Sequence, residues 1–156
     1  MITYQPQICY VPNQTLELKA LIQAISSTDG IHNISRQVLP ELVRIIKAHW
    51  IGLYAFENRT TAPLFVSNGL TEATASYLER SCCIEFNCYT QYPDAQYSMP
   101  AFAAPHIKGS LQYFPLIHHN ELMGLLVTES CICITDLEQW EKLLIVFSDK
   151  LTDLFK

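Results

Sequence analysis

Cysteines are the residues of this sequence most suited to chemistry, and five of the six lie in two groups. Cys82, Cys83 and Cys88 form the first group, and Cys131 and Cys133 form the second. A zinc or iron–sulfur site needs about four thiolates that converge on one point, and neither group has the usual CxxC spacing. Free cysteines are also common in apolar cores. The sequence therefore predicts no metal site, and it leaves inert core thiols and a redox-sensing thiol pair as alternatives.

The histidines offer little further chemistry. His118 and His119 adjoin a predicted turn, where exposure to solvent explains them, whereas His106 lies in a segment rich in aromatic residues. The sequence contains no Ser/His/Asp arrangement, no paired-carboxylate motif and no phosphate-binding glycine loop. We therefore predict no catalytic residue and no cofactor.

The segment from residue 86 to residue 120 has the most unusual composition in the chain. Only Asp94 and Lys108 in it are charged, although it is rich in tyrosine, phenylalanine and proline. Tyrosine and phenylalanine bury large areas, and a tyrosine hydroxyl can orient a bound molecule. We expect this segment to be packed, either as the wall of a small-molecule pocket or as ordinary core over a sheet.

The overall composition limits the class of protein. The chain has 156 residues, of which 49% are hydrophobic and 16% charged, and a net charge of -5. This length predicts one domain with a full core. The basic residues are not clustered, which argues against direct nucleic-acid contact, and no apolar run is long enough to span a membrane. Residues 1–12 have no secretory-signal pattern, so we predict a cytoplasmic protein without structural disulfides.

Hydrophobic periodicity and turn residues predict an α+β order of elements. Asn13 is expected to cap a helix that ends at Asp29-Gly30, and Pro40 is expected to kink a second helix or to mark its start. Asn68-Gly69 and His119-Asn120 are expected to form turns. The remaining predicted elements are strands at residues 50–56, 62–67, 111–118 and 121–130, and a short helix at residues 71–80 that begins with Thr71 as its cap.

The last helix has the clearest pattern in the sequence. Thr135-Asp136-Leu137-Glu138 is typical of a capping box, in which the threonine and glutamate side chains bond free backbone N–H groups. Apolar residues then alternate at spacings of three and four, which is the spacing of a coiled-coil seam. This seam either covers the sheet of its own domain or pairs with a second helix in a dimer. Its residues are Leu137, Trp140, Leu144, Phe147, Leu151 and Leu154.

The order and spacing of these elements resemble a GAF domain, a small sensory module of signalling proteins. Residues 42–56 (LVRIIKAHWIGLYAF) are similar to the stretch where a helix of the family leads into its first strand. Residues 113–129 (YFPLIHHNELMGLLVTE) are similar to the hairpin of the family, with Pro115-Leu116 and Gly124 in the expected places. The helix after Thr135 is similar to the one that closes the fold. A PAS-like domain is the nearest alternative, but the two helical patterns near the N-terminus favour GAF.

The resemblance implies a fold and a function. It implies one domain at residues 13–156 after an N-terminal extension at 1–12, with an antiparallel sheet, terminal helices on one face and a loop-covered pocket on the other. Residues 81–110 would form the pocket wall, and a small, unidentified ligand would be sensed there without catalysis. The helix at residues 135–156 would relay binding to a homodimer partner or a downstream effector. The expected ligand contacts are Trp50, Tyr89, Tyr97, Phe102 and His106.

Other members of the family suggest alternative functions. Bilin-binding members attach their chromophore through a Cys-His pair, which this sequence lacks, and the motif of cyclic-nucleotide-binding members is also missing. Members that reduce free methionine sulfoxide carry a catalytic cysteine where this sequence has Ala103-Ala104. A thiol-based sensor or such a reductase stays as one alternative function. A module that serves only dimerisation is another.

Overall fold

The fold is built on one antiparallel sheet. The computed structural model describes residues 12–55, 64–91, 106–108, 111–129 and 131–154. Within these residues the sheet has five strands in the order β2-β1-β5-β4-β3. The strands are β1 (Ile51–Ala55), β2 (Leu64–Asn68), β3 (His106–Lys108), β4 (Leu111–His118) and β5 (Glu121–Glu129).

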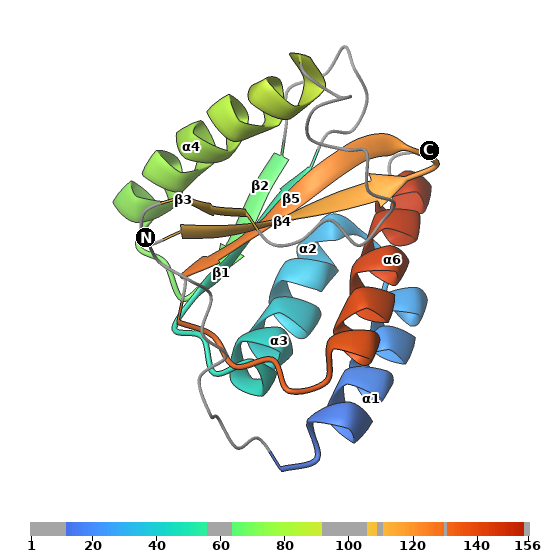
Figure 1. Cartoon of the computed structure of the whole chain (residues 1–156). Coiled ribbons are helices and arrows are strands. Elements are labelled where there is room, and N and C mark those ends of the chain that lie inside the picture. The colour runs from blue at the N-terminus through green and yellow to red at the C-terminus, as the bar shows by residue number, and fades with distance from the viewer. Residues whose placement is uncertain (1–11, 56–63, 92–105, 109–110, 130, 155–156) are drawn as a thin grey trace.

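Helices cover both faces of the sheet, and Figure 1 shows how unequal the two layers are. The terminal helices α1 (Gln14–Ser27) and α6 (Leu137–Leu154) lie on one face together with α2 (Ile31–Asn33), η1 (Ile34–Val38) and α3 (Leu39–Ile45). Helix α4 (Glu72–Gln91) lies on the opposite face. The predicted α+β class, with an antiparallel sheet and both terminal helices on one face, is confirmed.

Alternation along the strands divides the interior into two cores. On β1, Ile51, Leu53 and Ala55 point into the larger core between the sheet and the terminal helices, whereas Tyr54 belongs to a smaller core beneath α4. We call these the helix-side core and the α4-side cluster. A strand that is apolar on both faces is buried on both, as β1 is throughout its length.

Pro40 lies where a π-helical segment gives way to an α-helix. Residues 34–38 form the π-helix η1, and α3 then begins at Leu39 with the proline in its first turn. Proline has no N–H to donate, and its ring would clash with a carbonyl one turn earlier, so a widened turn before it relieves both problems. Of the two outcomes expected at Pro40, the structure therefore has a helix that starts there.

The β4–β5 hairpin follows the predicted boundaries closely. His119 and Asn120 have φ angles of 49° and 64°, the left-handed pair that a two-residue turn needs to match the twist of its strands. The pairing shifts by one residue between Leu116 and Ile117, so Met123 forms a bulge. The hairpin thus places Gly124 opposite Leu116 on one side and Ala55 on the other.

The predicted short helix at residues 71–80 is too short. Thr71 does cap it, because its Oγ1 accepts a hydrogen bond from the N–H of Thr74 at 3.3 Å. However, α4 continues to Gln91, since neither glycine nor proline interrupts residues 72–91. Leu78, Cys82 and Phe86 recur every four residues and are all buried, so packing against the sheet extends the helix into the region predicted as loop.

The predicted capping box at the start of α6 does not form. Asp136 is the residue before the helix, and its Oδ1 accepts the hydrogen bond from the N–H of Gln139 at 3.1 Å. Thr135 Oγ1 instead donates to Gln14 Oε1 at 2.7 Å. Asn13 likewise precedes α1 but makes no capping hydrogen bond with its side chain. The cap at Thr135 was misassigned because sequence spacing does not reveal its distant competing partner. Asn13 is the N-cap residue of α1, as predicted, but its backbone has a left-handed conformation with φ 64°.

Replacing Asp136 by alanine should lower the free energy of unfolding by about 1 kcal/mol, the usual value of a helix N-cap. The Thr15 hydroxyl, followed by the N–H of Gln139, holds the pKa of the Asp136 carboxyl below its ordinary value. A carboxylate with a depressed pKa stabilises the fold above its unfolded pKa and loses that effect as the pH falls through the folded pKa. The cost should therefore begin to decrease below about pH 4, where the unfolded carboxyl becomes protonated, and it should disappear only below the depressed folded pKa. Urea unfolding of both proteins at several pH values measures this difference in the free energy of unfolding.

Glu138→Ala is the matched control for this cap. Glu138 is exposed, and its carboxylate contacts only Lys142, four residues on, at 3.4 Å. An exposed pair of this kind contributes little. A loss of stability at Glu138 as large as that at Asp136 would mean that the capping box forms after all.

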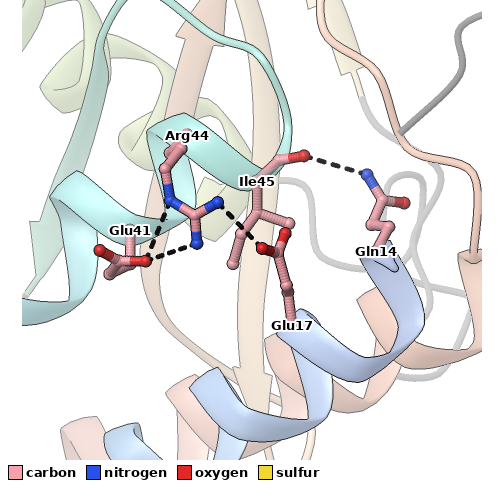
Figure 2. Close-up of polar contacts among 5 residues, drawn as sticks. All are labelled: Gln14, Glu17, Glu41, Arg44 and Ile45. Atoms are coloured by element: carbon pink, nitrogen blue, oxygen red, sulfur yellow. Dashed lines mark hydrogen bonds and ion pairs between the residues drawn. The ribbon is translucent and has the colours of Figure 1, made fainter. Parts of the chain in front are cut away.

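Gln14 fastens the start of α1 to two other parts of the helical layer. Its Nε2 donates to the carbonyls of Ile45 at 3.2 Å and Cys133 at 2.8 Å. Its Oε1 accepts from the N–H groups of Thr135 and Asp136 as well as from the Thr135 hydroxyl. Figure 2 shows the bond to Ile45 at the end of α3. A buried amide with this many partners holds three chain segments in one arrangement.

A second link between α1 and α3 lies at the surface. The Arg44 guanidinium contacts Glu41 in its own helix at 2.7 Å and Glu17 of α1 at 2.9 Å, as Figure 2 also shows. More than half of the Arg44 side chain is exposed, so solvent screens both ion pairs and their contribution is small.

Among the described residues, no helix is long and apolar enough to span a membrane.

Candidate functional site

The α4-side cluster is the candidate site, because it lies on the face of the sheet opposite the terminal helices and includes both aromatic and polar side chains. Its buried members come from three strands and from α4, and half-buried aromatic and aliphatic side chains pack around them. The buried members are Tyr54, Cys82, Phe86, Tyr113, Leu125 and Val127, and the half-buried ones are Trp50, Phe65, Cys83, Leu111 and Leu122. Aromatic rings with a few hydroxyl and thiol groups are the usual lining of a small-molecule site.

Glycine at position 52 shapes the floor of this cluster. Trp50, Gly52 and Tyr54 are alternate residues and so belong to the same face of the sheet. A Cβ at Gly52 would lie 2.6 Å from Cζ of Phe65, so the missing side chain leaves room for that ring. The Phe65 ring therefore lies over Gly52, between Tyr54 of β1 and Trp50, which directly precedes that strand.

Tyr54 is the central polar residue of the cluster. Its side chain is fully buried, and its ring lies 5.8 Å from that of Phe86, tilted by 56°. Burial, followed by a hydrogen bond with the Cys83 thiol, raises the pKa of the Tyr54 hydroxyl well above its ordinary value. The hydroxyl thus stays neutral across the physiological range, and it can orient a weakly polar molecule but cannot act as a base.

Tyr54→Phe should make the protein less sensitive to alkaline pH. A phenol with a raised pKa stabilises the fold below its unfolded pKa, and this stabilisation disappears as the pH rises through the folded pKa. Tyr54 therefore begins to favour unfolding above about pH 10, where the unfolded chain ionises. Urea midpoints measured from about pH 8 to about pH 11 should fall less steeply for the variant.

Tyr77→Phe is the control for the alkaline titration, because Tyr77 is 59% exposed on the outer side of α4. Removing an exposed phenol should leave the alkaline decline unchanged. If both variants decline like the unmodified protein, the buried hydroxyl is not the source of the effect.

The structure brings only part of the predicted ligand set to this site. Trp50 is half-buried against the α4-side cluster. His106 begins β3 and pairs with Tyr113 of β4. Tyr89 is on α4 rather than in a loop, and the description does not extend to its side chain. Tyr97 and Phe102 lie outside the described residues.

The seam of the last helix is mostly occupied within the domain. Trp140, Leu144, Phe147 and Leu151 are all buried in the helix-side core, with exposures of 0–4%. Leu137 is 60% exposed, and the side chain of Leu154 is not described. The alternative in which this seam covers the sheet of its own domain therefore accounts for the four buried residues, and they are not free to contact a partner.

The side chains of four cysteines are described, and each has a different environment. Cys82 is buried, Cys83 is half-buried beside Tyr54, and Cys131 is exposed. Cys133 is buried and disulfide-bonded, which corrects the expectation that no structural disulfide forms. Within the described ranges, no three metal-ligating side chains come together.

The histidines at the sheet ends make carboxylate contacts. His118 Nδ1 lies 2.6 Å from Asp149 Oδ1, which joins the hairpin to α6, and the His118 and His119 rings are 4.1 Å apart. His49 Nδ1 lies 2.9 Å from Glu129 Oε1. His118 is therefore not simply solvent-exposed, as its place beside the turn suggested.

Sequence reasoning missed the residues that lie at the centre of the site. Tyr54, Phe65 and Tyr113 are in strands, whereas the expected contacts were sought in the aromatic loop. The signal that could have found Tyr54 and Tyr113 is alternation, because both stand between residues of the opposite face. Cys83 could not be placed because the length of α4 was underestimated.

The fold is similar to that of several solved structures. No family model matches the sequence, and no curated protein matches it. The GAF domain of a phosphoenolpyruvate-protein phosphotransferase from Coxiella burnetii is similar, with a TM-score of 0.59 and 14% identity over 93% of this chain and 96% of that one. The corresponding Acinetobacter domain gives a TM-score of 0.55 and 17% identity over 94% of each chain.

A third similar structure is an enzyme. The free methionine-R-sulfoxide reductase of Neisseria meningitidis, determined with its substrate, gives a TM-score of 0.51 and 15% identity. The similarity covers 98% of this chain and 96% of that one. At such identities the comparisons establish a shared fold, and the predicted resemblance is confirmed at that level.

Proposed function

From the GAF-domain fold of this chain, we propose that it is a sensory or regulatory domain that binds a small, weakly polar molecule on the α4 side of its sheet. The observation that carries the proposal is the α4-side cluster, where the Tyr54 hydroxyl and the Cys83 thiol meet aromatic rings from three elements. The helix-side core is lined mainly by aliphatic residues from the helices packed over it. The two faces are thus chemically different, because the α4 side brings a buried phenol and a thiol together with several aromatic rings.

The proposed ligand is uncharged or weakly polar. The α4-side cluster contains no acidic, basic or histidine side chain, and its central phenol, Tyr54, stays protonated. A charged group placed there would lose its hydration without a counter-ion, which is costly. Stacking on aromatic rings and one hydrogen bond to a phenol suit a flat molecule with a single polar edge.

Strands β4 and β5 provide the proposed route from this site to α6. Tyr113 and Val127 face the α4-side cluster, while their neighbours Phe114 and Leu126 face the helix-side core. The Phe114 ring contacts that of Trp140 edge to face, with centroids 5.0 Å apart. A ligand that shifts the two strands would therefore shift the start of α6.

A partner would meet the outer side of the terminal helices. A shallow groove between α1 and α6 is lined by residues outside the buried seam, namely Lys19, Ile22, Gln23, Gln139, Lys142, Ile145 and Val146. Its lining combines three aliphatic side chains with two lysines and two glutamines. We propose that a homodimer or effector contact uses this surface rather than the seam. Sedimentation of the protein with Ile145→Glu, compared with Asp149→Ala outside the groove, tests whether a dimer depends on it.

Thermal unfolding with a metabolite panel tests the binding proposal. A ligand at about 100 times its dissociation constant should add about 2.7 kcal/mol of stability, because it binds only the native state. Tyr54→Phe should weaken binding, whereas Tyr77→Phe on the exposed side of α4 should not. If no compound stabilises the protein, or if both variants bind as well as the unmodified chain, the α4-side cluster is ordinary core.

Reduction of a sulfoxide is the second candidate function, favoured by the similar reductase and by the two thiols of α4. Cys82 is fully buried, so Cys83 is the more accessible of the pair. An assay with free methionine-R-sulfoxide and a dithiol reductant distinguishes the two candidates. Turnover that Cys83→Ser abolishes would replace the sensory proposal, while binding without turnover would support it.

A further inference from the structure

Two buried polar atoms of the helix-side core have no hydrogen-bond partner among the described residues. They are Oε1 of Gln112 on β4 and Nε1 of Trp140 in the first turn of α6. Gln112 is 1% exposed and Trp140 is 3% exposed, so bulk solvent does not reach either side chain. Buried polar atoms in native proteins are nearly always hydrogen-bonded to protein or to bound water, because leaving one without a partner costs about 1–3 kcal/mol.

The two side chains are next to the same phenylalanine. Phe114 is two residues after Gln112 on β4 and therefore on the same face of the sheet. The Trp140 ring meets Phe114 at 5.0 Å between centroids, with 71° between the ring planes. Gln112 and Trp140 thus approach Phe114 from the strand and from the helix.

Thr128 adds a third polar group at this place. It is fully buried and lies directly opposite Gln112 on β5 and opposite Ile51 on β1. Ile51 belongs to the helix-side core, and residues paired across strands share a face, so Thr128 and Gln112 are on that side too. The Thr128 hydroxyl donates its proton to the carbonyl of Glu129 at 2.9 Å, which leaves its oxygen lone pairs to accept.

The three groups match the bonding capacity of a water molecule. The Trp140 indole can only donate, whereas Gln112 Oε1 and the remaining lone pairs of Thr128 Oγ1 can only accept. A water molecule accepts from one donor and donates to two acceptors, and buried waters usually make about three hydrogen bonds. We propose that one water molecule is bound between β4, β5 and the first turn of α6 by Trp140, Gln112 and Thr128.

This water would join the proposed relay helix to the sheet. The Phe114 and Trp140 rings are a contact between β4 and the first turn of α6. Ring contacts tolerate small sliding, whereas hydrogen bonds to one shared water fix the position of the indole along the strand. The inference does not depend on the ligand proposed for the α4 side.

Water-selective NMR on the complete protein tests the site directly. The sequence has two tryptophans, so Trp140→Phe assigns the Trp140 indole signal and Trp50 serves as the internal reference. We expect a nuclear Overhauser effect between the Trp140 indole proton and a long-lived water, and its loss in Gln112→Leu. An indole proton that contacts only the Gln112 side chain, or neither water nor Gln112, overturns the proposal.

A double-mutant cycle in urea gives an independent readout. Trp140→Phe and Gln112→Leu should each lower the unfolding midpoint, because each leaves the shared water with a missing partner. The double variant should lower the unfolding midpoint by clearly less than the sum of the two single shifts. Once one side chain has been replaced, removing the other leaves no further group without its hydrogen-bond partner. Additive shifts contradict a shared water. Thr128→Val, which keeps the shape of the side chain, should couple to both in the same way.

Discussion

Replacing Gly124 by alanine should lower the free energy of unfolding by about 3 kcal/mol or more, at or beyond the upper end of the usual cost of overpacking. A Cβ at this position would lie 2.3 Å from the carbonyl oxygen of Tyr54 and 3.3 Å from Cα of Ala55. Both atoms belong to the backbone of β1, which pairs with β5 at this point. The added methyl group can be accommodated only if the two central strands separate.

Gly52→Ala is the matched control for this effect. Its Cβ would also be crowded, at 2.6 Å from Phe65 Cζ, but that atom is the far end of a side chain that can turn away. We expect a cost of about 1–2 kcal/mol there, within the usual range for overpacking. Urea unfolding followed by circular dichroism compares the two variants. A loss at Gly124 no larger than that at Gly52 would mean that the strands are not as close as described.

Replacing Gln14 by leucine should cost about 3 kcal/mol of stability. The change leaves the carbonyls of Ile45 and Cys133 and the N–H groups of Thr135 and Asp136 without the partner that Gln14 provides. Each buried backbone group left without a partner costs about 1–3 kcal/mol, and relaxation toward solvent recovers part of the sum. Leucine keeps the size of the side chain, so the loss reports hydrogen bonds more than packing.

Gln37→Leu in η1, which belongs to the same helical layer, is the control for Gln14. Gln37 is exposed and lies outside the groove between α1 and α6, so the same substitution there removes no buried contact. Its unfolding midpoint should stay within about 0.5 kcal/mol of that of the unmodified protein, as for most surface changes. Hydrogen exchange adds a local readout, since Gln14→Leu should expose the Thr135 and Asp136 amides. Unchanged protection of these amides would show that another group holds the connection.

Local patterns were sufficient for the fold class and for most of the elements, although β3 was not predicted as a strand and α4 was predicted too short. Alternation predicted β1, β4 and β5, and the His119-Asn120 turn followed from two residues that tolerate positive φ angles. The order of these elements was sufficient to suggest a GAF-like arrangement, because short connections between antiparallel strands leave few topologies. The helical period of α6 was equally clear.

Local sequence patterns did not predict the hydrogen-bond partner of a residue that had two suitable partners. Thr135 could cap α6 or bond to Gln14, and it bonds to Gln14, which is 121 positions away. Nothing in the polar neighbourhood of Gln14 indicated that it would be buried. The end of α4 was also predicted too early. Phe86 packs in the α4-side cluster, and this contact favours helix next to a segment that is rich in loop-forming residues.

The sequence by itself determined which faces of this protein are apolar, since that depends only on residue type and on the period of helix or strand. Tertiary structure decided what covers each face. The α6 seam is apolar in either of its interpretations, but only the position of the sheet and α1 shows that Trp140, Leu144, Phe147 and Leu151 are buried within their own domain. Tyr54 and Trp50 came together in the α4-side cluster for the same reason, because α4 and three strands meet there from distant parts of the chain.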